Sequence, residues 1–410
     1  MPQPHRTLDT AALVALSDAA FACSDEDLFG LELEWPVHRH GDVGRRPGVD
    51  EMAPLDGTVL PAGGRITFEP GGQVELSTAP FASVSEALRA ARSDSQVVFA
   101  RLHAAGFACE TRAVDDRRKP ERVLTKPRYQ AMDAFFSKRG TSGLWMMANT
   151  AATQINVSHD PSDPALRWHL LNRIAPVLIA CFANSPGLDA DGQHWTSLRQ
   201  AIWWAIDPSR TRPVRTDLPP AQAWLDYALA ANVMFISGER KQGATFTAIK
   251  PGLSFRQWMG EGHRLGWPTI EDFQCHLSTL FVPVRPRGWL ELRVLDALPE
   301  RIREVAALCV AAACSPRASR ELLDQLPATD HLWMPAIRDG LQDDTLAALA
   351  SKFLDVVERH LSSVAPTRDH ADQVAHFRAR YTEQRRSPGS DLDREYDMRV
   401  QPQLAAALAV

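Results

Sequence analysis

The 410-residue sequence lacks the marks of several protein classes. It has no apolar run approaching the roughly 20 residues that a membrane-spanning helix needs. No hydrophobic core of a secretory signal follows the first residues. Lys and Arg are scattered along the chain and the formal net charge is −5, which argues against nucleic acid as the main partner. We therefore expect a cytoplasmic protein that binds neither membrane nor nucleic acid.

Cysteine clusters and common nucleotide motifs are also missing. The six cysteines are widely spaced, with no C-x-x-C pair and no histidine at zinc-finger spacing. We expect reduced and mostly buried thiols. Neither a G-x-x-x-x-G-K-[ST] loop nor a G-x-G-x-x-G fingerprint occurs, so a bound nucleotide must be held in another way. The chemistry is therefore expected to depend on oxygen ligands.

What the sequence does contain is a strand-like segment with two carboxylates on one side. Residues 31–35 read Leu-Glu-Leu-Glu-Trp. Because strand side chains alternate, Glu32 and Glu34 share one face and the apolar residues share the other. Adjacent like charges repel unless a cation lies between them, and a divalent cation with oxygen ligands meets that need. The first hypothesis is a magnesium site on a sheet.

The same alternation recurs in three other segments. Gln73 aligns with Glu75, Gln154 with Asn156, and Glu291 with Arg293. A one-sided sheet that faces water shows the same alternation, and this alternative stays open. The four polar sets contain no lysine, which favours the lining of a site over a plain solvent face.

The periodicity predicts an α+β fold. The expected strands cover residues 30–36, 65–69, 73–78, 107–114, 146–157, 273–283 and 289–295, with a turn at 284–288. Helices are expected between these strands and, after Pro299, at about 318–325, 344–364 and 369–386. We expect one domain over residues 1–410, with a core sheet at about 25–296 and a C-terminal helical layer at about 299–386.

A longer motif gives a more specific indication. Residues 69–80 read E-P-G-G-Q-V-E-L-S-T-A-P, which resembles the signature of the plant and bacterial branch of the glutamate–cysteine ligases. Further matches follow in the order of that family: Met-Met at 146–147 with Gln-Ile-Asn at 154–156, Ala-Asn-Ser-Pro at 183–186, Arg199 before Ile-Trp at 202–203, His-Leu-Ser-Thr-Leu-Phe at 276–281, and Leu-Glu-Leu-Arg at 290–293.

Two departures from the plant pattern stand out. The segment at residues 187–192 is short, and Val294 stands where a glycine is expected. The short segment and the Ala- and Arg-rich composition resemble the actinobacterial members that make γ-glutamylcysteine for ergothioneine.

The resemblance implies a glutamine-synthetase-like fold, in which helices surround a curved antiparallel sheet whose concave face holds the active site. It implies Mg²⁺ as cofactor and L-glutamate, L-cysteine and ATP as substrates. We expect the chain to work as a monomer. The reaction would join the γ-carboxylate of glutamate to the cysteine amine through γ-glutamyl phosphate, releasing ADP and phosphate.

The resemblance also implies residue roles. The metal ligands would come from Glu32, Glu34, Glu69, Glu75, Gln154 and Glu291. Arg199 would bind the α-carboxylate of glutamate beside Trp203, and Arg293 with Glu291 would act on the transferred phosphoryl group. Nucleotide contacts would come from Arg128, Gln154 and Arg293, although an ordinary surface role for Arg128 is an open alternative. The substrate channel would be lined by Met147, Thr150 and Asn156, and the cysteine pocket by Tyr227.

Two alternatives belong to other classes. The protein could ligate glutamate to a different amine, since amine choice depends on pocket shape. It could also be a non-catalytic relative that binds glutamate or nucleotide. That second alternative is disfavoured because the chain retains all five carboxylates of the ligand set, Glu32, Glu34, Glu69, Glu75 and Glu291.

Overall fold

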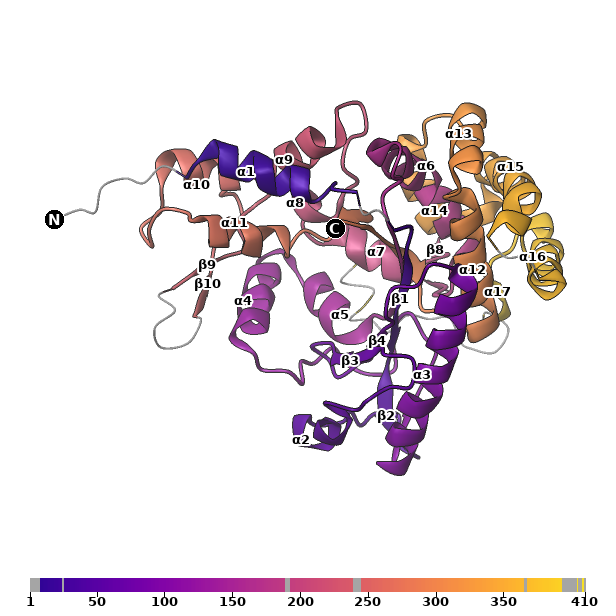
Figure 1. Ribbon diagram of the computed structural model, residues 1–410. Coiled ribbons are helices and arrows are strands. Elements are labelled where there is room, and N and C mark those ends of the chain that lie inside the picture. The colour runs from indigo at the N-terminus through magenta and orange to yellow at the C-terminus, as the bar shows by residue number, and fades with distance from the viewer. Residues whose placement is uncertain are drawn as a thin grey trace.

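The computed structural model describes residues 8–23, 26–188, 192–238, 245–364 and 367–392, together with Leu404 and Leu408. Its centre is a six-stranded sheet in which every neighbouring pair is antiparallel (Figure 1). The strand order is β11 (Val284–Pro286), β12 (Leu290–Asp296), β6 (Ala152–Val157), β1 (Phe29–Trp35), β4 (Val74–Ser77) and β3 (Arg65–Phe68). The predicted α+β class with an antiparallel sheet is confirmed.

The alternation in β1 separates an apolar face from a polar one. Leu31, Leu33 and Trp35 are buried, and the Trp35 ring meets Phe99 of α3 (Val84–Ala104) edge-to-face at 5.1 Å. Helices α6 (Pro164–Phe182) and α12 (Glu300–Ala313) pack on β12 and β6. Figure 1 shows α4 (Pro127–Phe136) and α5 (Ser142–Asn149) on the other side of β1 and β4. The polar face of the sheet therefore lies on the side of α4 and α5.

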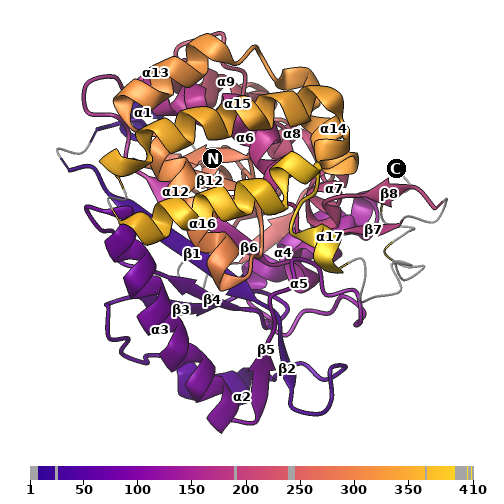
Figure 2. The same ribbon diagram turned by 90° about the vertical axis from the view of Figure 1, so that its right-hand side faces the viewer.

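The C-terminal helices form an outer layer against α6 and α12 (Figure 2). They are α13 (Pro316–Gln325), α14 (Trp333–Arg338), α15 (Asp344–His360), α16 (Arg368–Arg380) and α17 (Gly389–Leu392). Within these layers the thiols of Cys181, Cys309 and Cys314 are buried. The expected C-terminal helices are thus present, with ends that differ by a few residues.

The remaining elements surround the other parts of the sheet. The helices are α1 (Thr10–Ala19), α2 (Val49–Met52), α7 (Leu198–Ala205), α8 (Pro208–Thr211), α9 (Pro220–Ala230), α10 (Phe255–Glu261) and α11 (Ile270–Leu277). The two-stranded pairs are β2 (Val37–Arg39) with β5 (Phe107–Cys109), β7 (Gly187–Leu188) with β8 (His194–Trp195), and β9 (Phe235–Ser237) with β10 (Phe246–Ala248). The strand expected at 107–114 is thus limited to β5. Residues 189–191 of the short segment lie outside the described residues. Among the described helices, none combines the length and apolar character of a bilayer span.

The strand predicted at residues 146–157 is wrong in its first half. Met146 and Met147 belong to α5, and β6 begins only at Ala152. A short apolar run fits a buried helix as well as a buried strand, so periodicity did not separate the two. The helical turn places Met146 and Met147 beside the polar face instead of within the sheet.

The strand predicted at residues 273–283 is also wrong, because this part of the chain begins with α11. Thr269 and Asp272 form a capping box at its start, a sequence signal that was overlooked. The hairpin partner of β12 is β11, which lies where a turn was expected. Pro286 is tolerated there because β11 is an edge strand and needs fewer ladder hydrogen bonds.

Candidate active site

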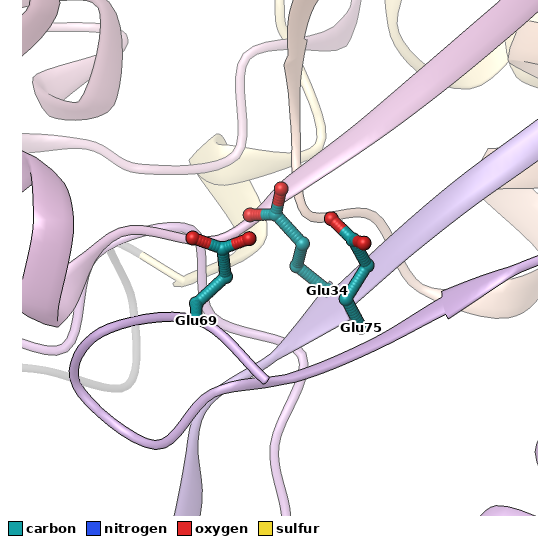
Figure 3. Close-up of side chains that lie close together, drawn as sticks. All are labelled: Glu34, Glu69 and Glu75. Atoms are coloured by element: carbon teal, nitrogen blue, oxygen red, sulfur yellow. The ribbon is translucent and has the colours of Figure 1, made fainter. Parts of the chain in front are cut away.

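Three carboxylates converge on the polar face of the sheet. Glu34 of β1 lies directly opposite Glu75 of β4, and Glu69 comes from the turn between β3 and β4. One carboxylate oxygen from each lies within 4.8 Å of the other two. Figure 3 shows the three side chains approaching one another from these separate segments. The strand ladder thus brings together residues that are up to 41 positions apart in the chain.

The cluster makes its own ionisation unfavourable. Burial first, and Glu75 second, raise the pKa of Glu34 to about 7. The same two causes raise the pKa of Glu69 well above its usual range, with Glu34 adding to the effect. Glu32 also has a raised pKa, from burial and then from Glu291 and Glu75. A divalent cation would relieve this repulsion, so the donor set fits magnesium bound through carboxylate oxygens.

Glu291 lies on the same face in a different environment. Its carboxylate is fully buried, accepting from Arg285 Nη2 at 3.0 Å and lying 3.1 Å from Arg293 Nη1. Burial alone would raise the pKa of Glu291, but Arg285 and then Arg293 outweigh it and lower the pKa to about 2. Glu291 is therefore ionised and holds two guanidinium groups at the edge of the carboxylate cluster.

Arg293 connects these two groups of side chains. Its Nη1 donates to Oε1 of Gln154 at 2.6 Å, and Gln154 Nε2 donates to Glu34 at 2.9 Å. Burial tends to lower the pKa of Arg293, but Glu291, Glu32 and the other carboxylates raise it overall. Arg293 is thus a fixed positive charge beside the carboxylates.

A break in the β12 ladder shapes the next part of the site. The register with β6 shifts between Leu292 and Leu295, which is the mark of a bulge. The carbonyl groups in this interval accept from α7: Arg199 Nη2 donates to Arg293 O at 3.1 Å, and Gln200 Nε2 donates to Val294 O at 2.7 Å. Val294 lies in this interval, so the bulge forms with a valine at the position where a glycine was expected.

Arg199 is buried and only partly satisfied. Its Nη1 lies 4.0 Å from Asp296, yet Nη1 and Nε have no hydrogen-bond partner among the described residues. The guanidinium carbons of Arg199 and Arg293 each lie 5.6 Å from the ring centre of Trp203. Burial lowers the pKa of Arg199, with Asp296 and Glu34 opposing the shift. Two buried donors without acceptors suit an anionic ligand group.

A cavity of about 490 Å³ opens over the polar face. Ten of the predicted site residues line it: Glu32, Glu34, Glu69, Glu75, Arg128, Met147, Thr150, Gln154, Trp203 and Arg293. Glu291, Arg199 and Asn156 lie behind this lining, each in contact with a lining residue. Asn156 donates to Glu32 at 3.0 Å. Tyr227 is not brought to this cavity, because it lies on α9 with its ring stacked on Trp224.

Several lining residues were missed in the sequence. They are Pro70, Lys126, Tyr129, Met132, Met146, Phe281, Arg285 and Arg287, whereas Gln73, which was expected on the polar face, does line the cavity. Arg285 and Arg287 alternate with Pro286 in the segment expected to be a turn, and this alternation was the available signal. Burial, and then Glu69, raise the pKa of Tyr129 to about 12. Arg128, which lines the cavity as predicted, donates from Nη2 to Ser278 Oγ at 2.8 Å.

Comparisons with known proteins give relatives that match most of the chain. Residues 28–403 match the model of glutamate–cysteine ligase family 2. The glutamate–cysteine ligase EgtA of Mycolicibacterium smegmatis is 34% identical over 372 residues, covering 88% of this chain and 85% of the relative. The EgtA of Mycobacterium tuberculosis is 33% identical over 368 residues, with 87% and 84% covered.

More distant relatives match as well. A chloroplastic glutamate–cysteine ligase of Arabidopsis thaliana is 28% identical over 313 residues, covering 72% of this chain and 57% of the relative. The solved structure of a Francisella tularensis glutamate–cysteine ligase in complex with AMP has a TM-score of 0.53 at 15% identity, covering 95% of this chain and 88% of that one. This structural likeness supports the fold.

Proposed function

Because the chain belongs to glutamate–cysteine ligase family 2, we propose that it joins the γ-carboxylate of glutamate to the amine of cysteine at the expense of ATP. The products would be γ-glutamylcysteine, ADP and phosphate. The observation that carries the proposal is the cluster of Glu34, Glu69 and Glu75 beside Arg293 inside one cavity. Carboxylates that hold cations, next to a fixed guanidinium, are what phosphoryl transfer requires.

The acidic residues would hold the metal. Glu34, Glu69 and Glu75 are the central ligands in this proposal, with Glu32 and Gln154 beside them. Bound Mg²⁺ would neutralise the charge of the ATP phosphates and polarise the group that is transferred. Glu291 would act mainly by fixing Arg285 and Arg293, since its carboxylate is already engaged by both.

The arginines would bind and orient the reacting groups. Arg293 is proposed to neutralise the γ-phosphoryl group as it passes to the γ-carboxylate of glutamate, giving γ-glutamyl phosphate. The two unpartnered donors of Arg199 suit the α-carboxylate of glutamate, with Trp203 in contact with both guanidinium groups. The amine of cysteine would then attack the activated carbonyl carbon and displace phosphate. Met147 and Thr150 line the cavity in which the acceptor would lie.

The likeness to the mycobacterial ligases supports the further proposal that the product serves ergothioneine synthesis. We also propose that the chain works as a single catalytic domain and as a cytoplasmic monomer.

The test is to follow ADP release by the purified protein with ATP, Mg²⁺ and glutamate, adding cysteine or one of a panel of other amines. We expect cysteine-dependent ADP release and a product with the mass of γ-glutamylcysteine. Glu75→Gln should abolish turnover, whereas Glu261→Gln, an exposed carboxylate of α10, should retain it. ADP release with a different amine alone would replace cysteine as substrate, and no ADP with any amine would refute ligase activity.

A further inference from the structure

The three clustered carboxylates are held in place in different ways. Glu34 and Glu75 belong to paired strands, so the ladder fixes their backbone. Glu69 belongs to a turn at residues 69–73, closed by hydrogen bonds from Gly72 N to Glu69 O and from Glu69 N to Gln73 O, both at 2.9 Å. Phe68 pairs with Val74 at the base of this turn, so the ladder holds its two ends. The position of its tip, residues 70–72, depends on contacts outside the sheet.

The far side of this turn is packed against the rest of the protein. Pro70 O accepts from Val123 N at 2.7 Å and from Leu124 N at 3.0 Å. A Cβ atom added to Gly71 would lie 2.1 Å from Ala148 O, so the turn touches the last turn of α5 directly. The position of Glu69 is therefore coupled to the backbone of α5.

Arg46 lies at this contact. Its Nη1 donates to Gly71 O at 3.0 Å and to Ala148 O at 2.9 Å, so one nitrogen joins the turn to α5. Its Nη2 donates to Lys119 O at 3.0 Å and to Asn149 Oδ1 at 2.8 Å. One side chain thus supplies four hydrogen bonds to three separate segments of the chain.

The acceptors of Arg46 are all neutral oxygens. Burial, and then the nearby Arg118, lower the pKa of Arg46 to about 10, so the guanidinium still carries its charge at neutral pH. The planar fork of arginine reaches these acceptors in fixed directions, whereas a lysine ammonium is a single point with a shorter reach. Arg46 also provides a positive charge at the carbonyl end of α5, where helix carbonyls lack partners.

We propose that Arg46 is a positioning residue for Glu69: it clamps the turn that carries this carboxylate against the end of α5, and so sets the third corner of the cation site. The inference rests on the proposed function, in which that site binds a divalent cation. Arg46 touches neither the cavity nor the reacting groups, and it acts through the carbonyl groups of Gly71 and Ala148. Groups that contact a metal ligand directly typically change metal affinity about 10- to 100-fold when they are lost, and Arg46, which acts through the backbone of the turn, is expected at the lower end of that range.

The test measures binding of Mn²⁺ alone to the full chain by electron paramagnetic resonance, in the absence of substrates. We expect Arg46→Met and Arg46→Lys to weaken Mn²⁺ binding by about tenfold or more. The matched control is Arg45→Met, which removes an exposed neighbour whose Nη2 contacts Glu51 at 2.7 Å. This control should bind Mn²⁺ as the unaltered protein does. If Arg46→Met does not fold, Arg46→Lys, which retains the positive charge, is used to measure the loss of Mn²⁺ binding.

A second background separates positioning from general destabilisation. In Glu69→Gln, the change Arg46→Met should cause no further loss of Mn²⁺ affinity, because the residue that it positions is no longer a ligand. Additive losses in the two variants would overturn the inference, as would unchanged binding in Arg46→Met or no Mn²⁺ binding by the unaltered protein.

ADP release by the unaltered protein is scored separately. If cysteine-dependent ADP release occurs but Arg46→Met binds Mn²⁺ normally, the ligase proposal stands and the clamp is refuted. If ADP release is absent but Mn²⁺ binding depends on Arg46 and Glu69 as described, the clamp stands and the ligase proposal fails.

Discussion

Replacing Glu34 with glutamine should stabilise the metal-free protein near pH 8. This is unusual for a residue proposed to be essential, and it follows from the charge cluster. Burial and Glu75 raise the pKa of Glu34 from 4.5 to about 7. Between these two values the folded protein holds a proton that the unfolded chain has released. The free energy of unfolding therefore falls as the pH rises through this window, and the loss is complete above about pH 7.

The magnitude follows from this shift and from the hydrogen bonds of Glu34. The rise in the pKa from 4.5 to about 7 corresponds to about 3.5 kcal/mol, at about 1.4 kcal/mol for each pH unit. Glu34 accepts from Ala152 N at 2.8 Å and from Gln154 Nε2 at 2.9 Å. Glutamine keeps only one of these acceptors, which costs about 1 kcal/mol. The net expectation for Glu34→Gln is a gain of about 2.5 kcal/mol in the free energy of unfolding at pH 8.

Urea unfolding in EDTA at pH 8 and pH 5 tests this expectation, with Glu261→Gln as the control for an exposed carboxylate. The gain should be present at pH 8 and should shrink toward pH 5, where Glu34 is protonated in the folded protein. Adding Mg²⁺ should stabilise the unaltered protein and leave Glu34→Gln nearly unchanged. If Glu34→Gln is no more stable than the unaltered protein at pH 8, the argument from burial and repulsion is wrong.

Three further outcomes are expected. Glu291→Gln should destabilise the protein by about 3 kcal/mol in urea unfolding, because Arg285 and Arg293 would remain buried without their carboxylate. A Glu291→Gln variant as stable as the unaltered protein would contradict this. Since the pKa of Glu291 is lowered from 4.5 to about 2, the stabilisation that Glu291 gives the unaltered protein should be lost as the pH falls from 4.5 toward 2. Arg199→Lys should raise the KM for glutamate by about tenfold or more, with a smaller change in the KM for cysteine, and equal changes in steady-state kinetics would count against its assignment. Tyr129→Phe should leave the pH–rate profile unchanged up to about pH 10, because the pKa of Tyr129 is about 12; loss of an alkaline limb in the variant would show that this phenol titrates during turnover.

The polar face could be predicted from the sequence because alternation in a strand determines which side chains share a face. Glu34 proved to lie opposite Glu75, Glu32 opposite Gln154, and Asn156 opposite Glu291. The register itself could not be predicted, since slippage by two residues leaves the same side chains on each face of a short alternating segment. The inclusion of Glu69 in the cluster depended on the geometry of its turn.

The missed residues depend on approach in three dimensions. Tyr129 reaches the cavity because α4 packs beside the sheet, and no local pattern records that packing. Arg46 lies in a glycine- and proline-rich segment that reads only as a loop, and its importance comes from carbonyl groups 25 and 102 residues away. Met146 and Met147 were placed in a strand because a short apolar run carries no clear period.

The buried thiols of the helical layers determine how the core of the protein reacts with disulfides in solution. Burial raises the pKa of Cys181 and Cys314 to about 12, and it raises the pKa of Cys309 as well. Thiol–disulfide exchange requires a thiolate, and at neutral pH these groups hold almost none. A ligase that uses cysteine would thus keep its own core thiols out of mixed disulfides. The redox state of the thiols around the protein would therefore not change the thiols of its folded core.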